Sequence, residues 1–193
     1  MSPGASVFLW INGLAGRFAP LDYLMRVIAS DYFMIVLMCA IMLVMWFGTS
    51  DLKTRERDQK AIICAAIGLG LSNVWVNLIN NVYFWPRPFD AGHAVNLIFY
   101  RPPDPSFPSN TAAVTFAIAT AVFMANRRMG GVFYIMAATM GFSRVFVGVH
   151  YPVDILGGAA LGSATSFVAF KLFHWSEPLP SCLVWLGRRL YLM

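Results

Sequence analysis

The segment SRVFVGVHYPVD, residues 143–154, sets side chains capable of chemistry into an otherwise apolar part of the chain. Tyr151 and Pro152 are typical of a helix start, because proline at the first helical position gives up an N–H that has no partner there. His150 then precedes the helix, and Asp154 lies about one turn into it, where its carboxylate can hold one imidazole N–H. The other ring nitrogen is free to act as a general base or a nucleophile. A lone histidine more often only bonds a loop, but the paired carboxylate favours the catalytic interpretation.

Two arginines and a serine complete this candidate site. The guanidinium groups of Arg87 and Arg144 match phosphate oxygens two at a time, although arginines at the ends of membrane spans also anchor to lipid headgroups. Ser109 follows a proline where a helix is expected to begin, so we predict an N-cap. The free backbone N–H groups of such a helix start also bind anions. Together these residues favour a phosphate site.

Other polar residues and motifs add little. His93, in the loop before Ser109, could supply a proton to a leaving group, although loop histidines are more often only solvated. His174 is expected on the opposite face, without a role. The chain has no GxxxxGK[ST] loop and no HExxH pair. We therefore expect no metal and no cofactor.

The composition is that of a membrane protein. Hydrophobic residues make up 59% of the 193 residues, charged residues make up 12%, and the mean hydropathy is +0.64. A soluble domain would not present so apolar a surface. The net charge of +5 does not indicate nucleic acid, because aromatic and basic residues do not interleave as such a surface requires. The basic residues instead fit contact with membrane lipids.

Five apolar segments are long enough, or nearly so, to cross a bilayer, which takes about 20 residues. They lie near residues 30–48, 60–84, 109–126, 131–149 and 152–173. We expect an all-α, polytopic transmembrane helix bundle of five to six spans, in one domain covering residues 1–193. Residues 1–29 form an interfacial segment or a broken first span, 30–173 the core spans, and 174–193 a cytoplasmic tail. Gly158 and Gly162 form a small-xxx-small pair that allows close packing in the bundle or a homodimer.

The distribution of Lys and Arg indicates the orientation. They gather in the stretches 48–60 and 125–131 and in the tail, which share one face if five core spans are present. The positive-inside rule assigns that face to the cytoplasm. The long proline-rich loop before Ser109 and the turn at His150 then face outward.

These residues resemble the type 2 phosphatidic acid phosphatases, the PAP2 or acid phosphatase/vanadium haloperoxidase superfamily. The third motif of this family, SR-x5-H-x3-D, is matched in full by Ser143, Arg144, His150 and Asp154. Four polar residues at fixed spacing in an apolar background make this a specific signal. The resemblance implies a PAP2/haloperoxidase-like helical fold.

The other two motifs are matched in part. The first, K-x6-RP, is present at the Arg-Pro pair that begins with Arg87, while Asn80 stands at the lysine position. The second, PSGH, is present at the Pro-Ser pair that ends with Ser109, while Asn110 and Thr111 replace the glycine and the histidine.

Over most of its length the chain resembles the bacterial undecaprenyl diphosphate phosphatases of the bacitracin-resistance type. The resemblance implies that His150 attacks phosphorus to give a phosphohistidine, that Asp154 orients it, and that no metal is needed. It also implies phosphate binding by Arg87, Arg144 and Ser109, with Ser143 and Asn110 in the same motifs. The implied substrate is a polyprenyl or other lipid phosphate. The implied location is the bacterial cytoplasmic membrane, with the active site facing the periplasm or the cell exterior.

Thr111 departs from this pattern, because the family histidine at its position protonates the leaving oxygen. Either the leaving group needs no acid, or another residue such as His93 replaces it, or the chain is an inactive natural or engineered variant. A diphosphate fits the first explanation, because its departing monophosphate is far less basic than an alkoxide. Two alternatives remain: a phosphatase of phosphatidylglycerophosphate, phosphatidic acid or lipid A, and a catalytically disabled protein that binds or transports lipid phosphates.

Overall fold

The apolar segments of the sequence fold into helices. The computed structural model describes residues 3–91, 94–178, 180–182 and 184–185, and every element in these ranges is helical. The elements are α1 (Pro3–Asn12), α2 (Ala19–Ala29), α3 (Phe33–Phe47), α4 (Leu52–Val82), the short 3₁₀ helix η1 (Pro88–Asp90), α5 (Asn110–Ala125), α6 (Arg127–Phe146) and α7 (Pro152–Trp175). The predicted all-α class is confirmed.

Side-chain caps set where several of these helices begin. The Asp51 carboxylate accepts a hydrogen bond from the Thr54 backbone N–H at 3.0 Å, so α4 starts at Leu52 and not near residue 60. Most of the basic stretch 48–60, which lay outside the span predicted near residues 60–84, therefore forms the first turns of α4, supported by an ion pair of Lys60 with Glu56 one turn earlier. α7 begins at Pro152, as its sequence predicts.

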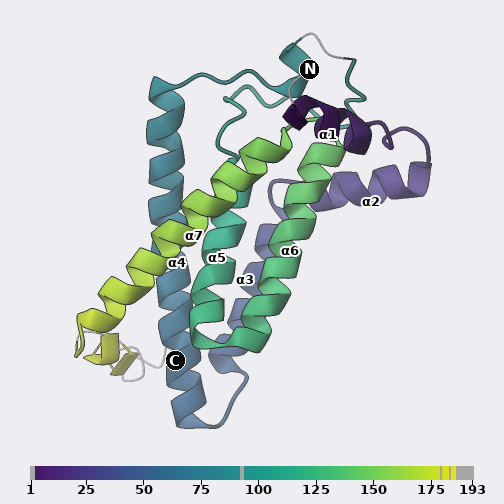
Figure 1. Ribbon diagram of the computed structural model, residues 1–193. Helices are drawn as coiled ribbons and strands as arrows, with labels where there is room; N and C mark the ends of the chain where they lie inside the picture. The colour runs from purple at the N-terminus through teal and green to yellow at the C-terminus, as the bar shows by residue number, and fades with distance from the viewer. Residues whose placement is uncertain (1–2, 92–93, 179, 183, 186–193) are drawn as a thin grey trace.

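Helix α5 is the centre of the bundle and packs against α4, α6 and α7 (Figure 1). It is rich in alanine and threonine, and most of its residues are buried. Gly158 and Gly162 of α7 let the two backbones approach closely. A Cβ atom at Gly162 would lie 2.0 Å from the Ala113 carbonyl oxygen, closer than any real contact. The small-xxx-small pair therefore serves packing within the chain, and a homodimer stays a prediction.

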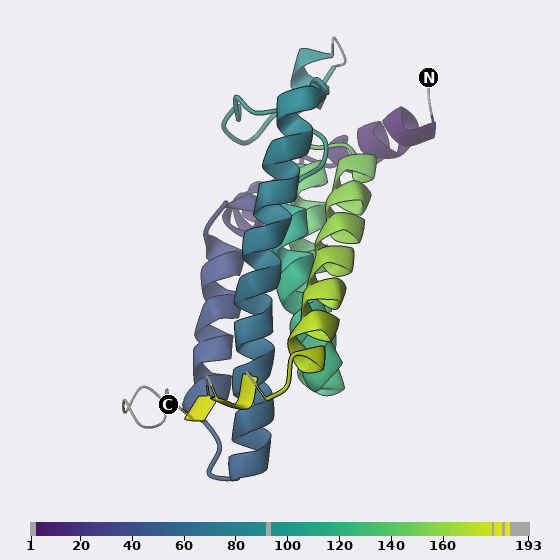
Figure 2. The same cartoon turned by 90° about the vertical axis from the view of Figure 1, so that its left-hand side faces the viewer.

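Apolar side chains cover much of the outside of the bundle. In Figure 2, α3, α4 and α7 run side by side, with the connection between α4 and α5 folded over the upper end. The outward-facing residues include Val36, Val44, Leu71, Trp75, Leu78, Ile135, Leu156, Phe167 and Leu172. A water-soluble surface would not carry so large an apolar area, so this exterior suits the interior of a lipid bilayer.

The number of membrane spans differs from the expectation. Within the part of the chain that the structure describes, α4, α6 and α7 are long and apolar enough to cross a membrane, and α2 with α3 passes the same test as a pair bent by 61°. α5 is apolar but has only 16 residues. The predicted count of five to six spans is therefore not confirmed.

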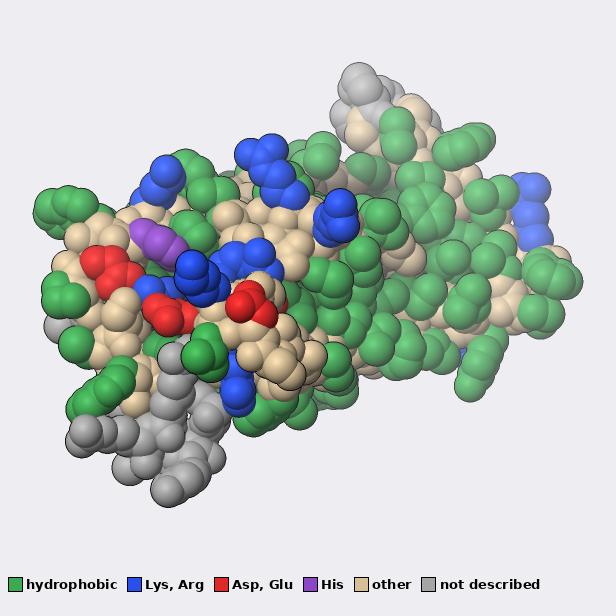
Figure 3. Space-filling view, turned by 90° about the horizontal axis from the view of Figure 1, so that it is seen from below, with side chains coloured by type: hydrophobic (Ala, Val, Ile, Leu, Met, Phe, Trp, Pro, Cys, Tyr) green, Lys and Arg blue, Asp and Glu red, His purple; other side chains and the backbone are tan. Residues whose placement is uncertain are grey.

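The N-terminal segment and the loop after α4 gather at one end of the bundle, where α2 lies across its axis (Figure 1). Asn12 ties these parts together. Its amide donates 2.9 Å hydrogen bonds to the carbonyl oxygens of Asn96 and Phe146, and its own oxygen accepts from the Asn96 N–H at 2.8 Å. The opposite end of the bundle, which Figure 3 shows from below, carries basic and acidic side chains.

Candidate active site

A tight turn between α6 and α7 positions His150, the predicted catalytic histidine, in the candidate active site. Gly148 has a φ of +91°, a conformation that residues with a side chain rarely adopt. A Cβ atom there would also lie 2.9 Å from Val95 and 3.1 Å from the amide nitrogen of Asn12. The glycine is therefore required where the chain reverses, and the imidazole two residues later is only 2% exposed.

The hydrogen bonds of His150 determine which ring nitrogen carries the proton. Nδ1 lies 3.0 Å from the backbone carbonyl oxygen of Ser106. Since a carbonyl oxygen can only accept, Nδ1 is the donor and the neutral ring keeps a lone pair on Nε2. Nε2 lies 3.3 Å from Nη1 of Arg87 and 3.4 Å from Oγ of Ser109. The lone pair thus faces the predicted phosphate-binding groups.

Asp154 supports this arrangement less directly than its spacing suggests. Its Oδ2 accepts hydrogen bonds from the Tyr151 backbone N–H at 2.7 Å and from the Ser106 hydroxyl at 2.5 Å, while Nδ1 of His150 lies 3.5 Å away. The closer acceptor for the imidazole is the Ser106 carbonyl. Asp154 therefore caps α7, supplies negative charge beside the ring, and holds Ser106, which in turn orients the histidine.

Arg87 is buried beside the imidazole, with 2% of its surface exposed. Its Nε donates to the Asp104 carbonyl oxygen at 2.8 Å and its Nη1 donates to the Val149 carbonyl oxygen at 2.9 Å. Nη2 pairs with the Asp104 carboxylate at 3.0 Å. The guanidinium is thus held chiefly by backbone oxygens, next to the residue that it is expected to assist.

Arg144 comes from the last turn of α6 and is 3% exposed. Its Nη1 donates to the Ala29 carbonyl oxygen at 2.8 Å and to the Asp31 carboxylate at 2.9 Å. Its guanidinium carbon lies 5.5 Å from the centre of the Phe99 ring. Nε is buried and makes no hydrogen bond within the described part of the chain.

These surroundings keep the imidazole neutral. Burial lowers the pKa of His150 well below its ordinary value of 6.5, and the positive charges of Arg144 and Arg87 lower it further. A neutral ring retains the Nε2 lone pair at physiological pH. A buried imidazole close to arginine side chains is an arrangement suited to phosphoryl transfer, in which positioning and charge stabilisation supply most of the catalysis.

The start of α5 closes the site. The Ser109 hydroxyl accepts from the Ala112 backbone N–H at 3.5 Å, as the N-cap prediction requires, and lies 3.2 Å from the Thr111 hydroxyl. Thr111 therefore occupies the position expected of the family acid, but its hydroxyl cannot serve as an acid near neutral pH. The side-chain oxygen of Asn110 is buried and finds no partner among the residues described.

Ser143 and Asn80, two of the predicted site residues, make no observed side-chain bond to His150, Arg87 or Ser109. Ser143 is buried, but its hydroxyl donates to the Met140 carbonyl oxygen of its own helix at 2.7 Å. Asn80 lies in the last turn of α4, and its side-chain oxygen has no partner in the described ranges. His93 lies outside the residues that the structure describes. His174 stacks on Phe170 near the C-terminal end of α7, away from the site.

Sequence reasoning missed Ser106, Asp31 and Asp104. Ser106 is fully buried and bonds the two motif-three residues His150 and Asp154. A second Pro-Ser pair, just ahead of the pair that ends with Ser109, was the signal that could have drawn attention to it. Asp31 and Asp104 were not detectable, because each pairs with an arginine through a tertiary contact, over 113 residues for Asp31 and 17 for Asp104.

Apolar hollows adjoin the site on the side of the α7 start. One cavity of about 320 Å³ is lined by Gly4, Ala5, Trp85, Pro86, Ala91, Tyr151 and Val153. A second, of about 230 Å³, is lined by Tyr83, Trp85, Phe107 and Val153. The two hollows share Trp85 and Val153, and Tyr151 directly follows His150. Apolar cavities with polar groups at one end are typical of sites for small amphipathic ligands.

Fold and site together define a class: a helical membrane protein with a buried histidine whose Nε2 lies 3.3 Å from Arg87, an arrangement suited to phosphoryl transfer. The chain belongs to the PAP2 superfamily, whose family model matches residues 61–178. The predicted family resemblance is therefore confirmed.

Relatives of known function and structure agree with this membership. The chain is 34% identical to the undecaprenyl-diphosphatase BcrC of Bacillus subtilis over 180 residues, which cover 92% of this chain and 88% of that protein. It is 29% identical to a lipid A 1-phosphatase of Rhizobium johnstonii over 65% of this chain and 56% of that protein. The crystal structure of Aquifex aeolicus LpxE superposes with a TM-score of 0.69 at 25% identity, covering 89% of this chain and 96% of that one.

Proposed function

We propose that this protein is a membrane phosphatase that removes the terminal phosphate of undecaprenyl diphosphate, or another polyprenyl diphosphate, and so recycles a carrier lipid for cell-wall synthesis. The similarity to an undecaprenyl-diphosphatase over most of both chains supports the substrate. The observation that carries the mechanism is the lone pair on Nε2 of His150, which faces Arg87 and Ser109 at 3.3 and 3.4 Å.

The reaction follows from these positions in two steps. Nε2 attacks the terminal phosphorus, the bond from that phosphorus to the bridging oxygen breaks, and the lipid monophosphate leaves. A water molecule then attacks the phosphohistidine, the N–P bond breaks, and phosphate departs. Arg87 and Arg144 stabilise the charge on the transferring oxygens. Asp154 and the Ser106 carbonyl stabilise the proton on Nδ1 while the ring carries positive character.

Two features of the chain favour a diphosphate lipid. Thr111 offers no acid at neutral pH, so a leaving group of low basicity is the better substrate. The hollows beside Tyr151 and Val153 could receive the first isoprenoid units of a tail. We also propose that the protein resides in the bacterial cytoplasmic membrane with this site on the outer face, because the basic helix ends lie at the other end of the bundle.

The decisive experiment is phosphate release from undecaprenyl diphosphate by the purified protein in detergent, with EDTA present. We expect release that EDTA does not reduce and that His150→Ala abolishes, while His174→Ala, a histidine at the other end of the bundle, leaves it unchanged. Substrate labelled in its terminal phosphate should transfer the label to the protein in an acid-labile, alkali-stable form that His150→Ala lacks. Release that survives in His150→Ala would refute the mechanism.

A second candidate, hydrolysis of lipid phosphate monoesters, is supported by the similarity to a lipid A phosphatase. Comparing undecaprenyl diphosphate with lipid A, phosphatidylglycerophosphate and phosphatidic acid distinguishes the two. We expect Thr111→His to raise turnover most on monoesters, because it adds the acid that a basic leaving group needs. Binding of all these lipids without hydrolysis would instead indicate a disabled, lipid-binding protein.

A further inference from the structure

The segment where α2 ends and the chain bends toward α3 binds the side chain of Arg144. Ala29 ends α2, so its carbonyl oxygen is among those that a helix leaves without an internal partner. It accepts from Nη1 of Arg144 at 2.8 Å, and the carboxylate of Asp31, two residues further on, accepts from the same nitrogen at 2.9 Å. Two acceptors from one bend in the chain thus hold one guanidinium nitrogen.

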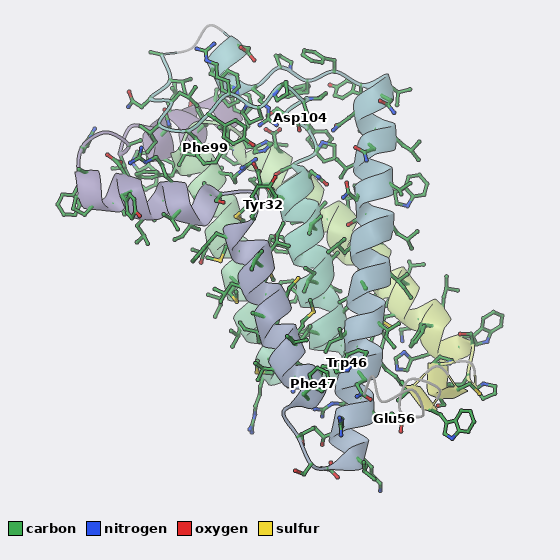
Figure 4. The ribbon with its side chains drawn as sticks, turned by 180° about the vertical axis from the view of Figure 1, so that it is seen from behind. Tyr32, Trp46, Phe47, Glu56, Phe99 and Asp104 are labelled. Carbon is green, nitrogen blue, oxygen red and sulfur yellow. The ribbon has the colours of Figure 1, made fainter. Side chains whose placement is uncertain are left out.

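The positive charge of Arg144 makes its contact with Asp31 important. A buried guanidinium is costly unless an opposite charge and hydrogen bonds compensate it, and Asp31 makes the ion pair observed for Arg144. Tyr100 donates its hydroxyl hydrogen to the other carboxylate oxygen of Asp31, and the Phe99 ring lies against the guanidinium. Figure 4 shows Phe99 at the same end of the bundle as Tyr32, the residue after Asp31, far from Trp46 and Glu56.

The hydrogen bonds to Ala29 and Asp31 leave one edge of the Arg144 guanidinium for a ligand. Both contacts are made by Nη1, and the guanidinium is planar and rigid, so fixing that corner fixes the edge formed by Nε and Nη2. Nε is buried and has no hydrogen-bond partner among the described residues. This edge carries two N–H donors side by side and can bind two phosphate oxygens at once. Arg87 differs, since three backbone carbonyl oxygens, of Asp104, Pro105 and Val149, lie within hydrogen-bonding distance of it.

We propose that Asp31 is a positioning residue for phosphoryl transfer: with the Ala29 carbonyl it holds Arg144 so that the Nε edge meets the transferring phosphate. Tyr100 fixes Asp31 in turn. Asp31 and Ala29 lie outside the range matched by the family model, residues 61–178, so this inference assigns the N-terminal segment a part in the site. This inference rests on the proposed function for the identity of the lipid substrate. The binding of a phosphate group by Arg144 does not depend on that identity.

The test compares Asp31→Ala, Asp31→Asn and Tyr100→Phe with the unmodified protein. A guanidinium displaced by about 1 Å can cost about 100-fold in rate, so we expect Asp31→Ala to lower kcat on undecaprenyl diphosphate about 10- to 100-fold. KM should stay within about threefold, because the loss falls on the transition state. Asp31→Asn keeps an oxygen acceptor and should recover part of the rate, and Tyr100→Phe should cause a smaller loss. Asp22→Ala, which removes an exposed α2 carboxylate bonded to the Gly16 N–H, is the matched control and should change neither constant.

Two further measurements separate positioning from a general effect on folding. In an Arg144→Ala background, Asp31→Ala should cause no further loss of rate, because Asp31 acts only through Arg144. Binding of orthovanadate, which adopts the five-coordinate geometry of the transition state, should weaken in Asp31→Ala by the same factor as kcat. An additive loss in the double variant, or an unchanged kcat in Asp31→Ala, overturns the proposal. If the unmodified protein binds vanadate in an Asp31-dependent way but does not hydrolyse undecaprenyl diphosphate, the proposed substrate fails and the positioning role stands.

Discussion

At the scale of single residues, the proposed mechanism requires a neutral imidazole at His150. Burial first, and then the charges of Arg144 and Arg87, lower the pKa of His150 below 6.5. Because the folded-state pKa of His150 is depressed, its neutral form, which the proposed mechanism needs, persists as the pH falls below 6.5. Unfolded chains take up that proton near 6.5 and the folded protein does not, so His150 makes stability decline as the pH falls further.

Histidine NMR on the protein in detergent can test this shift directly. We expect the His150 signal to titrate below 6.5, or not at all before unfolding, and Arg144→Gln to move its midpoint upward, because a repelling charge is removed. His150→Gln identifies the signal, and His174, outside the site, serves as the internal reference. A midpoint at or above 6.5 in the unmodified protein would contradict the electrostatic account.

Some residues of the candidate site could be predicted from the sequence, and others could not. His150, Arg87 and Ser109 could be named because fixed spacings and helix-start chemistry restrict their positions, and the structure places their polar atoms within hydrogen-bonding distance. Ser106 and Asp31 could not, because their partners are set by tertiary contacts over 44 and 113 residues. Ser143 shows the converse, since a motif residue can satisfy its hydroxyl within its own helix.

At the scale of elements, the contact between α5 and α7 positions the site. A Cβ atom at Gly158 would lie 2.4 Å from the Ser109 carbonyl oxygen, and one at Gly162 would lie 2.0 Å from that of Ala113. Neither backbone oxygen can yield without moving α5. The Ser109 cap and the turn at His150 therefore keep their spacing only while these positions lack side chains.

Gly162→Ala should destabilise the protein by about 1–3 kcal/mol, the usual cost of overpacking a tight contact. Gly158→Ala should in addition lower activity by more than its stability loss explains, since it displaces the start of α5 beside His150. Thermal unfolding in detergent and phosphate release measure the two effects. Gly70→Ala on α4 is the control, because a Cβ atom there would meet nothing within 4 Å, and it should be neutral or slightly stabilising. Equal behaviour of Gly162→Ala and Gly70→Ala would refute this packing account.

Local sequence signals determine some helix boundaries but not others. The starts of α5 and α7 follow from Ser109 and Pro152 and were predictable. The 61° bend between α2 and α3 was not, because the sequence there has neither proline nor glycine. The bend is stabilised by contacts such as that of Asp31 with Arg144, which no local pattern records.

At the scale of the whole molecule, charge separates the two ends of the bundle. The end with the α4 start and the α5–α6 turn carries Lys53, Arg55, Arg57, Lys60, Arg127 and Arg128. The other end carries His150 and the proline-rich connection, with Arg87 and Arg144 buried in the site. Since basic segments are retained in the cytoplasm, the site should face outward, where the terminal phosphate of a spent carrier lipid would be exposed.

Cysteine labelling in intact cells tests this orientation. Cys182 follows α7 near the basic end and is exposed, so a membrane-impermeant maleimide should label it only after the membrane is permeabilised. Ala91→Cys, in a Cys182→Ser background, places an exposed thiol in the connection after η1 at the site end and should react without permeabilisation. The Cys182→Ser protein without the new thiol measures any reaction at Cys39. Labelling of Cys182 but not of residue 91 in intact cells would show that the site faces the cytoplasm. A lipid whose diphosphate is released outside could then reach His150 only after crossing the membrane.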